Sequence, residues 1–120
     1  MALSWKWLVV DCVDPVQVAR FWADVFGVRA EADQDDGEWI VVSPDSSVKL
    51  LFVPVPEAKT VKNRLHLDLT PSSPDEQQAE VERLVALGAT RADVGQTGEE
   101  SWVVLADPAG NEFCVLSGKA

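Results

Sequence analysis

The sequence predicts an α+β fold in which one unit, a strand, a helix and three further strands, occurs twice. The first observation is a pair of segments with helical spacing of apolar residues, each opened by a capping residue and proline, at Asp14-Pro15 and Ser73-Pro74. The second is alternating β-formers around turn residues, clearest in Trp102–Leu116 (WVVLADPAGNEFCVL). The third is a regular offset between the halves, which is 59 residues both for Trp7 with His66 and for the two caps.

The first half begins with a predicted strand over Ser4–Asp11, with Trp5 and Trp7 on one face. A helix follows from Pro15 to the stop at Gly27, with Asp14 and Gln17 forming a capping box. Its buried face is predicted to consist of Val18, Phe21, Trp22 and Val25. The remaining predicted elements are a short strand, a turn and two longer strands, at Val28–Ala32, Gln34–Gly37, Trp39–Ser43 and Val48–Val53.

The second half repeats this order. Arg64–Leu69 (RLHLDL) is a predicted strand with His66 and Asp68 on one face and Leu65, Leu67 and Leu69 on the other. A capping box from Ser73 to Glu76 opens a helix that ends at Gly88. Its predicted buried residues are Val81, Leu84 and Val85, and the elements after it are a short strand, a polar loop and a strand pair, at Arg91–Val94, Gly95–Glu100 and Trp102–Leu116.

The repeat predicts the domain organisation. A chain of 120 residues fits a single domain over 1–120, with module one at about 4–54, a linker at about 55–63 and module two at about 64–118. Trp39 aligns with Trp102 and Pro44 with Pro108 at slightly larger offsets, as small insertions between two copies of one unit would produce. The alternative interpretation is chance similarity of generic α+β patterning.

Composition excludes several classes of partner. A net charge of −10 opposes binding to nucleic acid. No apolar stretch approaches the ~18 residues of a membrane span, so no membrane association is expected. Two cysteines without a signal peptide do not indicate a secreted disulfide scaffold, and a cytoplasmic location is expected.

Three segments carry a resemblance to a known superfamily: Asp11–Gly27 (DCVDPVQVARFWADVFG), Lys62–Leu69 (KNRLHLDL) and Trp102–Leu116. With the repeated βαβββ unit, the sequence resembles the vicinal oxygen chelate superfamily, in its glyoxalase-like, bleomycin-resistance-type branch. The resemblance implies two modules that form a shared cavity with the helices outside. It does not imply one reaction, because this fold hosts several chemistries.

The resemblance also implies where a divalent metal would bind. The ligand positions of the superfamily fall on Trp7 and His66 in the first strands, and on Leu50 or a neighbour and Cys114 in the last strands. His66 is the one ordinary ligand in this set, and zinc requires at least three protein ligands. We therefore expect no metal and no cofactor, with an atypical metal site from His66, Asp68 and Glu112 as the alternative.

His66 and Glu112 are the predicted catalytic residues. His66 has a near-neutral pKa that suits a general base, and Asp68 could orient its ring; the alternative role is that of a polar residue lining a wet cavity. Glu112 is a possible general base or, alternatively, an acceptor for the amides of the 107–111 turn.

Three tryptophans are predicted to form an aromatic ligand site: Trp7, Trp39 and Trp102. His66, Asp68 and Cys114 complete the predicted ligand-binding set. Trp7 could instead fill the cavity and leave no pocket, and Cys114 could simply pack in the core.

Three functions are open to such a protein. The preferred one is binding, or acting on, a small organic compound, with aromatic compounds among the candidates. If the protein is an enzyme, it is a glyoxalase-like lyase or isomerase. The second is a metal-dependent lyase, isomerase or dioxygenase with an atypical ligand set. The third is a non-catalytic interaction module, and a homodimer supported by Trp5 and Phe52 is expected.

Overall fold

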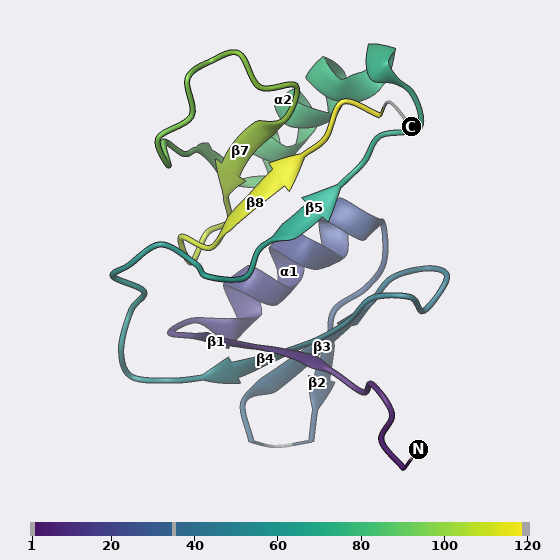
Figure 1. Ribbon diagram of the computed structural model, residues 1–120. Coiled ribbons are helices and arrows are strands. Elements are labelled where there is room, and N and C mark those ends of the chain that lie inside the picture. The colour runs from purple at the N-terminus through teal and green to yellow at the C-terminus, as the bar shows by residue number, and fades with distance from the viewer. Residues whose placement is uncertain (1, 35, 119–120) are drawn as a thin grey trace. The chain divides into compact units, whose positions relative to one another are not determined.

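The computed structural model describes residues 2–34 and 36–118, and the chain divides into two compact units, Met1–Ala58 and Lys59–Ala120 (Figure 1). Each unit contains one four-stranded mixed sheet and one α-helix, which confirms the predicted α+β class. The boundary between the units falls inside the predicted linker at 55–63. The organisation of residues 1–120 as a single domain stays a prediction. Within the described residues, no helix combines the length and apolar content needed to cross a membrane.

The first unit has the strand order β1-β4-β3-β2, with β1 parallel to β4 and the other neighbours antiparallel. Asp35, in the predicted turn at 34–37, lies outside the described residues. The elements in chain order are β1 (Leu8–Cys12), α1 (Pro15–Phe26), β2 (Glu31–Asp33), β3 (Glu38–Val42) and β4 (Lys49–Pro54).

Helix α1 forms as its sequence predicts, except that Val25, predicted to be buried, is only half-buried. The Asp14 side chain caps it by accepting a hydrogen bond from the Gln17 amide at 3.3 Å, and Gly27 ends it in the left-handed conformation at φ 67°. The Trp22 ring is buried and meets Phe21 edge to face with ring centroids 5.3 Å apart. The helix therefore presents one apolar face to the core of its unit, as its 3.6-residue periodicity indicates.

The second unit repeats this topology. Its strand order is β5-β8-β7-β6, and the first strand is again parallel to the last. The predicted duplication of the βαβββ unit is therefore visible in the sheet order itself. The elements are β5 (Leu67–Leu69), η1 (Pro74–Glu76), α2 (Gln77–Leu87), β6 (Thr90–Arg91), β7 (Val103–Ala106) and β8 (Glu112–Val115).

The first strand of each unit, which lies at an edge of its sheet, is shorter than predicted. The strand predicted from Ser4 begins at Leu8, and the strand predicted from Arg64 begins at Leu67. An edge strand pairs only along its one neighbour, and the first pairs are Leu8 with Leu50 and Leu67 with Phe113. The predicted placement of Leu65 on the apolar face is wrong, because Leu65 precedes this pairing and is 81% exposed.

The start of the second helix also differs from prediction. The Ser73 side chain makes no capping hydrogen bond, so the predicted capping box to Glu76 is wrong. Residues 74–76 form a 3₁₀ turn instead, and α2 begins at Gln77. Val85, predicted to be buried, is 42% exposed, whereas Val81 and Leu84 are buried and Gly88 ends the helix as expected.

The strand register corrects one predicted equivalence between the halves. If Leu8 corresponds to Leu67, the parallel pairs make Phe52 correspond to Val115. Trp39 pairs with Phe52 and Val103 pairs with Val115, so Trp39 corresponds to Val103 and not to Trp102. A displacement of one residue in a strand turns a side chain to the opposite face. The predicted match of Trp39 with Trp102 is therefore wrong by one position.

Candidate functional site

A pocket of about 320 Å³ lies on one face of the second sheet, in the size range of small-molecule sites. Every residue that lines it belongs to Lys59–Ala120. Strands β5, β7 and β8, which lie side by side in Figure 1, form its floor. The lining residues are Lys62, Asn63, His66, Asp68, Val94, Trp102, Val104, Glu112, Phe113, Cys114 and Leu116.

The alternation of β8 explains which side chains reach the pocket. Glu112 and Cys114 project to the pocket face, whereas Val115, between Cys114 and Leu116, turns to the apolar face and is buried. Cys114 pairs with Asp68 on β5 and with Val104 on β7. Cys114 is therefore at the centre of the floor, with a carboxylate on one side and an apolar side chain on the other.

The carboxylate of Asp68 connects the polar groups of the floor. Its Oδ1 atom lies 3.2 Å from Nε2 of His66, and both side chains are nearly half exposed. Burial raises the pKa of the Cys114 thiol above its ordinary value of 9.0, and the charge of Asp68 and a hydrogen bond to it raise the pKa further. The thiol is therefore protonated at neutral pH and donates to Asp68, which makes Cys114 a poor nucleophile.

These three side chains also make up a possible metal-binding group. One ligand atom from each of His66, Asp68 and Cys114 lies within 4.8 Å of the others. Imidazole, carboxylate and thiolate together suit zinc or a similar borderline metal, and three protein ligands match the number in catalytic zinc sites. The residues present therefore fit such an ion. Cys114 takes the place that Glu112 has in the predicted alternative set.

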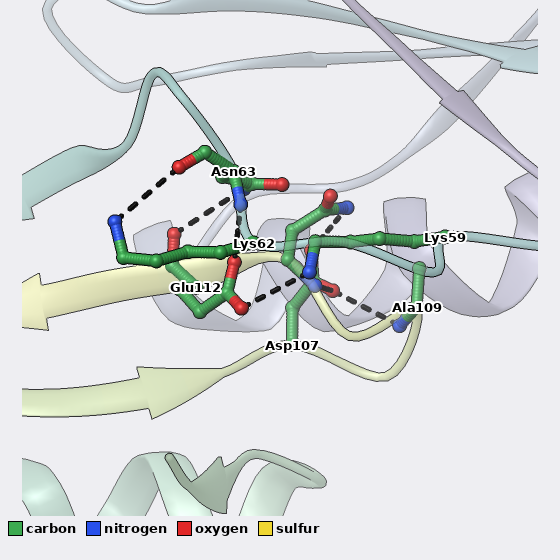
Figure 2. A network of polar contacts seen from close by, with 7 residues as sticks. Lys59, Lys62, Asn63, Asp107, Ala109 and Glu112 are labelled. Carbon is green, nitrogen blue, oxygen red and sulfur yellow. Dashed lines mark hydrogen bonds and ion pairs between the residues drawn. The ribbon is translucent and has the colours of Figure 1, made fainter. Parts of the chain in front are cut away.

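Glu112 is engaged with the segment that precedes β5, as Figure 2 shows. Its carboxylate accepts hydrogen bonds from the Lys59 ammonium at 3.0 Å and from the Asn63 amide at 2.9 Å, and the side chain is only 15% exposed. Burial by itself would raise the pKa of Glu112, but the hydrogen bonds from Asn63 and Lys59 outweigh it and lower the pKa. The carboxylate is therefore ionised at neutral pH and already has two donors.

The 107–111 turn is closed by a different carboxylate. Asp107 Oδ1 accepts hydrogen bonds from the amides of Ala109 and Asn111, both at 2.9 Å (Figure 2). The interpretation of Glu112 as the acceptor for these turn amides is therefore wrong. An aspartate that accepts from amides two and four residues ahead is an ordinary way to build such a turn.

Trp102 forms the apolar end of the pocket and remains 45% exposed. The residue before it is held by helix α2, because the Gln77 side-chain amide donates to the carbonyls of Ser101 at 2.8 Å and Val115 at 3.2 Å. Gln77 thus connects the entry to β7 with the end of β8. The indole is attached to this anchored segment, and its exposed part is available to a ligand in the pocket.

The structure brings together five of the predicted site residues: His66, Asp68, Trp102, Glu112 and Cys114. Trp7 and Trp39 lie in Met1–Ala58, and their part in a ligand site stays a prediction. Sequence reasoning missed the other lining residues, which are Lys62, Asn63, Val94, Val104, Phe113 and Leu116. The alternation of β8 beyond Cys114 could have identified Leu116, whereas Lys62 and Asn63 were assigned to a linker without regular structure.

The family described as a glyoxalase-like domain matches residues 7–116. Among solved structures, a possible glyoxalase from Bacillus cereus is 17% identical with a TM-score of 0.72 and covers 96% of this chain and 99% of its own. The fosfomycin resistance protein FosX from Listeria monocytogenes is 15% identical with a TM-score of 0.74 and coverages of 99% and 94%. No match was found among curated proteins. These similarities confirm the predicted superfamily and fold.

Proposed function

Because the chain belongs to the glyoxalase-like domain family, we propose that it binds a small organic molecule in the pocket on its second sheet. The observation that carries the proposal is the composition of this pocket. An apolar wall of Val94, Trp102 and Leu116 faces the same space as the polar pair His66 and Asp68. Ligand sites combine such a wall with a few polar groups that orient the ligand.

The polar pair also supplies a route to catalysis. The Asp68 carboxylate lies 3.2 Å from Nε2 of His66, so it can fix the orientation of the ring. An imidazole held in this way can take a proton from a bound substrate and return it at another atom. This is the step that a lyase or isomerase of the glyoxalase-like type needs, and we assign it to His66. The other predicted catalytic residue, Glu112, has the lowered pKa of a structural carboxylate, so its contribution is to the pocket wall.

Tryptophan fluorescence during a titration with small aromatic compounds tests the binding proposal. The chain has five tryptophans, so the contribution of Trp102 is isolated by comparing Trp102→Phe with Trp5→Phe, a change at an exposed residue of the other unit. Saturable quenching in the wild type and Trp5→Phe that is lost in Trp102→Phe supports the pocket. Quenching that survives in Trp102→Phe, or no binding by a broad thermal-shift screen, contradicts it.

A second candidate function is metal-dependent chemistry at the same site. It is favoured by the convergence of His66, Asp68 and Cys114 within 4.8 Å. One solved relative in fold, a mutant of FosX, is described in complex with Mn(II) and 1S,2S-dihydroxypropylphosphonic acid. A bound zinc-like ion would act as a Lewis acid on a substrate oxygen. Our expectation of a metal-free site stays the preferred proposal, because Asp68 and the protonated Cys114 already satisfy one another.

Cobalt(II) titration distinguishes these candidates without an activity assay. Coordination by Cys114 produces thiolate-to-metal charge-transfer absorption, which Cys114→Ser removes and Cys12→Ser retains. Such a band at one equivalent of cobalt, together with stoichiometric metal in protein purified without chelator, supports the metal-dependent function. If neither is observed, the metal-free proposal stands.

Two further expectations accompany the proposal. A homodimer and a cytoplasmic location remain predictions from the sequence. Light scattering after size-exclusion chromatography measures the mass against the 13.1 kDa of one chain and tests the dimer. A tight dimer whose pocket rejects every compound would favour the third function, a non-catalytic interaction module.

A further inference from the structure

We infer that the pocket selects small organic acids, with the Lys62 ammonium receiving the ligand's carboxylate and the Trp102 end receiving its apolar or aromatic part. This inference rests on the proposed function and adds to it a ligand class and a recognising residue. It follows from the order of groups along the sheet and from which charges already have partners.

The two ends of the pocket differ in chemistry. His66 lies one residue before the first pair of β5 with β8, next to the start of β8 at Glu112, and Lys62 and Asn63 line the pocket from the segment held by Glu112. At the opposite end of β8, Leu116 and Trp102 lie just beyond the pair of Val103 with Val115. The pocket is therefore polar where β8 begins and apolar where β8 ends.

The two carboxylates of the polar end already have partners, whereas the Lys62 ammonium has no carboxylate beside it. The carboxylate of Glu112 pairs with Lys59, and that of Asp68 interacts with His66 and with the Cys114 thiol. The Lys62 ammonium, by contrast, donates to an uncharged acceptor, the carbonyl of Asn63 at 3.4 Å. Among the described residues that line the pocket, Lys62 is the lysine, and its ammonium contacts an uncharged acceptor and no carboxylate, so it is available to an anionic ligand.

The positive charge of Lys62 acts on Cys114 in the floor of the pocket. Its ammonium lowers the pKa of Cys114, against the larger effects of burial and Asp68. A ligand carboxylate beside Lys62 would therefore sit near His66, the group to which we assign proton transfer. An acid bound in this orientation would have its carbon skeleton along the floor toward Trp102.

Glu112 acts here as a positioning residue. It holds Lys59 by its side chain and Asn63 by its main chain, and Lys62 is adjacent to Asn63 (Figure 2). The two anchors limit where the chain between them can lie, and so where the Lys62 side chain begins. Without this carboxylate the 59–63 segment would lose both anchors to β8.

A pair of probes that differ in charge alone tests the inference: 1-naphthoate and its neutral amide, 1-naphthamide, titrated calorimetrically into the full chain. The wild type is expected to bind 1-naphthoate about fivefold more tightly, the size of one partly exposed ion pair, and the preference should shrink as salt is added. Lys62→Met should abolish the preference by weakening 1-naphthoate alone, and Lys62→Arg should retain it. Lys49→Met, at an exposed lysine of the first unit, is the matched control.

The outcomes separate this inference from the function on which it rests. Equal binding of the two probes overturns the selection of acids but leaves the small-molecule pocket intact. A preference for 1-naphthoate that persists in Lys62→Met overturns the assignment of Lys62. Binding of neither probe contradicts the selection of aromatic acids and the aromatic pocket together.

Discussion

Asp68 and Cys114 stand directly opposite each other in the parallel pair of β5 and β8, and the Cys114 thiol donates a hydrogen bond to the Asp68 carboxylate. This contact explains why a carboxylate and a cysteine can share the floor of a pocket. The carboxylate is stabilised by the thiol and by His66, and the thiol in turn is held in its neutral form. The floor therefore offers hydrogen bonding and a base, but no thiolate nucleophile.

Replacing Asp68 with asparagine should lower the pKa of Cys114. The substitution removes the negative charge that raises this pKa and leaves an uncharged, weaker amide acceptor, while burial continues to raise the pKa. The rate at which iodoacetamide alkylates Cys114 follows the fraction of thiolate and can be measured by peptide mass spectrometry across a pH series. This rate should begin to increase at a lower pH in Asp68→Asn than in the wild type. Asp75→Asn, at an exposed aspartate of η1, is the control and should leave the profile unchanged. An unaltered profile in Asp68→Asn would contradict the contact.

Glu112 should contribute pH-dependent stability. Its pKa is lower in the folded protein than the ordinary value of 4.5, so the contribution is present above that value and is lost as the pH falls through the native pKa. Glu112→Gln should therefore reduce the free energy of unfolding by about 1.5 kcal/mol at neutral pH, as expected for charge-assisted hydrogen bonds. As the pH falls through this lowered native pKa the difference should shrink, because the wild-type carboxyl then also becomes uncharged.

Urea unfolding of the wild type and of Glu112→Gln, at neutral pH and at a pH below the native pKa of Glu112, measures this effect. Glu57→Gln is a suitable control, because Glu57 is exposed and near the same segment in sequence. An equal destabilisation by Glu112→Gln at both pH values would contradict this prediction. It would show that the shape of the Glu112 side chain, and not its charge, holds Lys59 and Asn63 in place.

Gln77 should hold the Trp102 wall in place. Gln77→Met keeps the length of the side chain and removes the amide that donates to Ser101 and Val115. We expect a loss of about 1 kcal/mol of stability, the size of an ordinary neutral hydrogen bond, and faster hydrogen exchange in residues 95–102. Gln78→Met, whose amide reaches only Glu82 in the same helix, should change neither. Unchanged exchange in Gln77→Met would mean that the loop is held by other contacts.

The sequence predicts the topology of this protein better than its strand ends. Caps and apolar periodicity identified α1 correctly because Asp14 and Gly27 act locally. The start of β5 depends instead on where β8 begins, which is a contact between residues far apart in the sequence. For the same reason the pairing of Trp39 with Trp102 failed by one residue, since the register is decided by the partner strand and not by the pattern.

The candidate site was predictable to the extent that it lies on alternating strands. His66 and Asp68 share a face with Cys114 and Glu112, and period-two patterning finds such residues. Lys62 and Asn63 are in an irregular segment whose position comes from Glu112, about fifty residues further along. No local pattern marks a segment that is held in place only by tertiary contacts.

The neighbours Phe113 and Cys114 should respond very differently to substitution. Phe113 is fully buried in the core of the second unit, so Phe113→Ala should cost about 3–5 kcal/mol through lost burial and a cavity. Cys114 lies on the pocket face and donates to Asp68, a bond that a serine hydroxyl can replace, so Cys114→Ser should cost less than about 1 kcal/mol. Chemical denaturation of both variants measures the two costs. Comparable losses in the two variants would contradict the division of β8 into a core face and a pocket face. Phe113 and Cys114 are adjacent and both buried, so the face to which each side chain points is the reason to expect different losses.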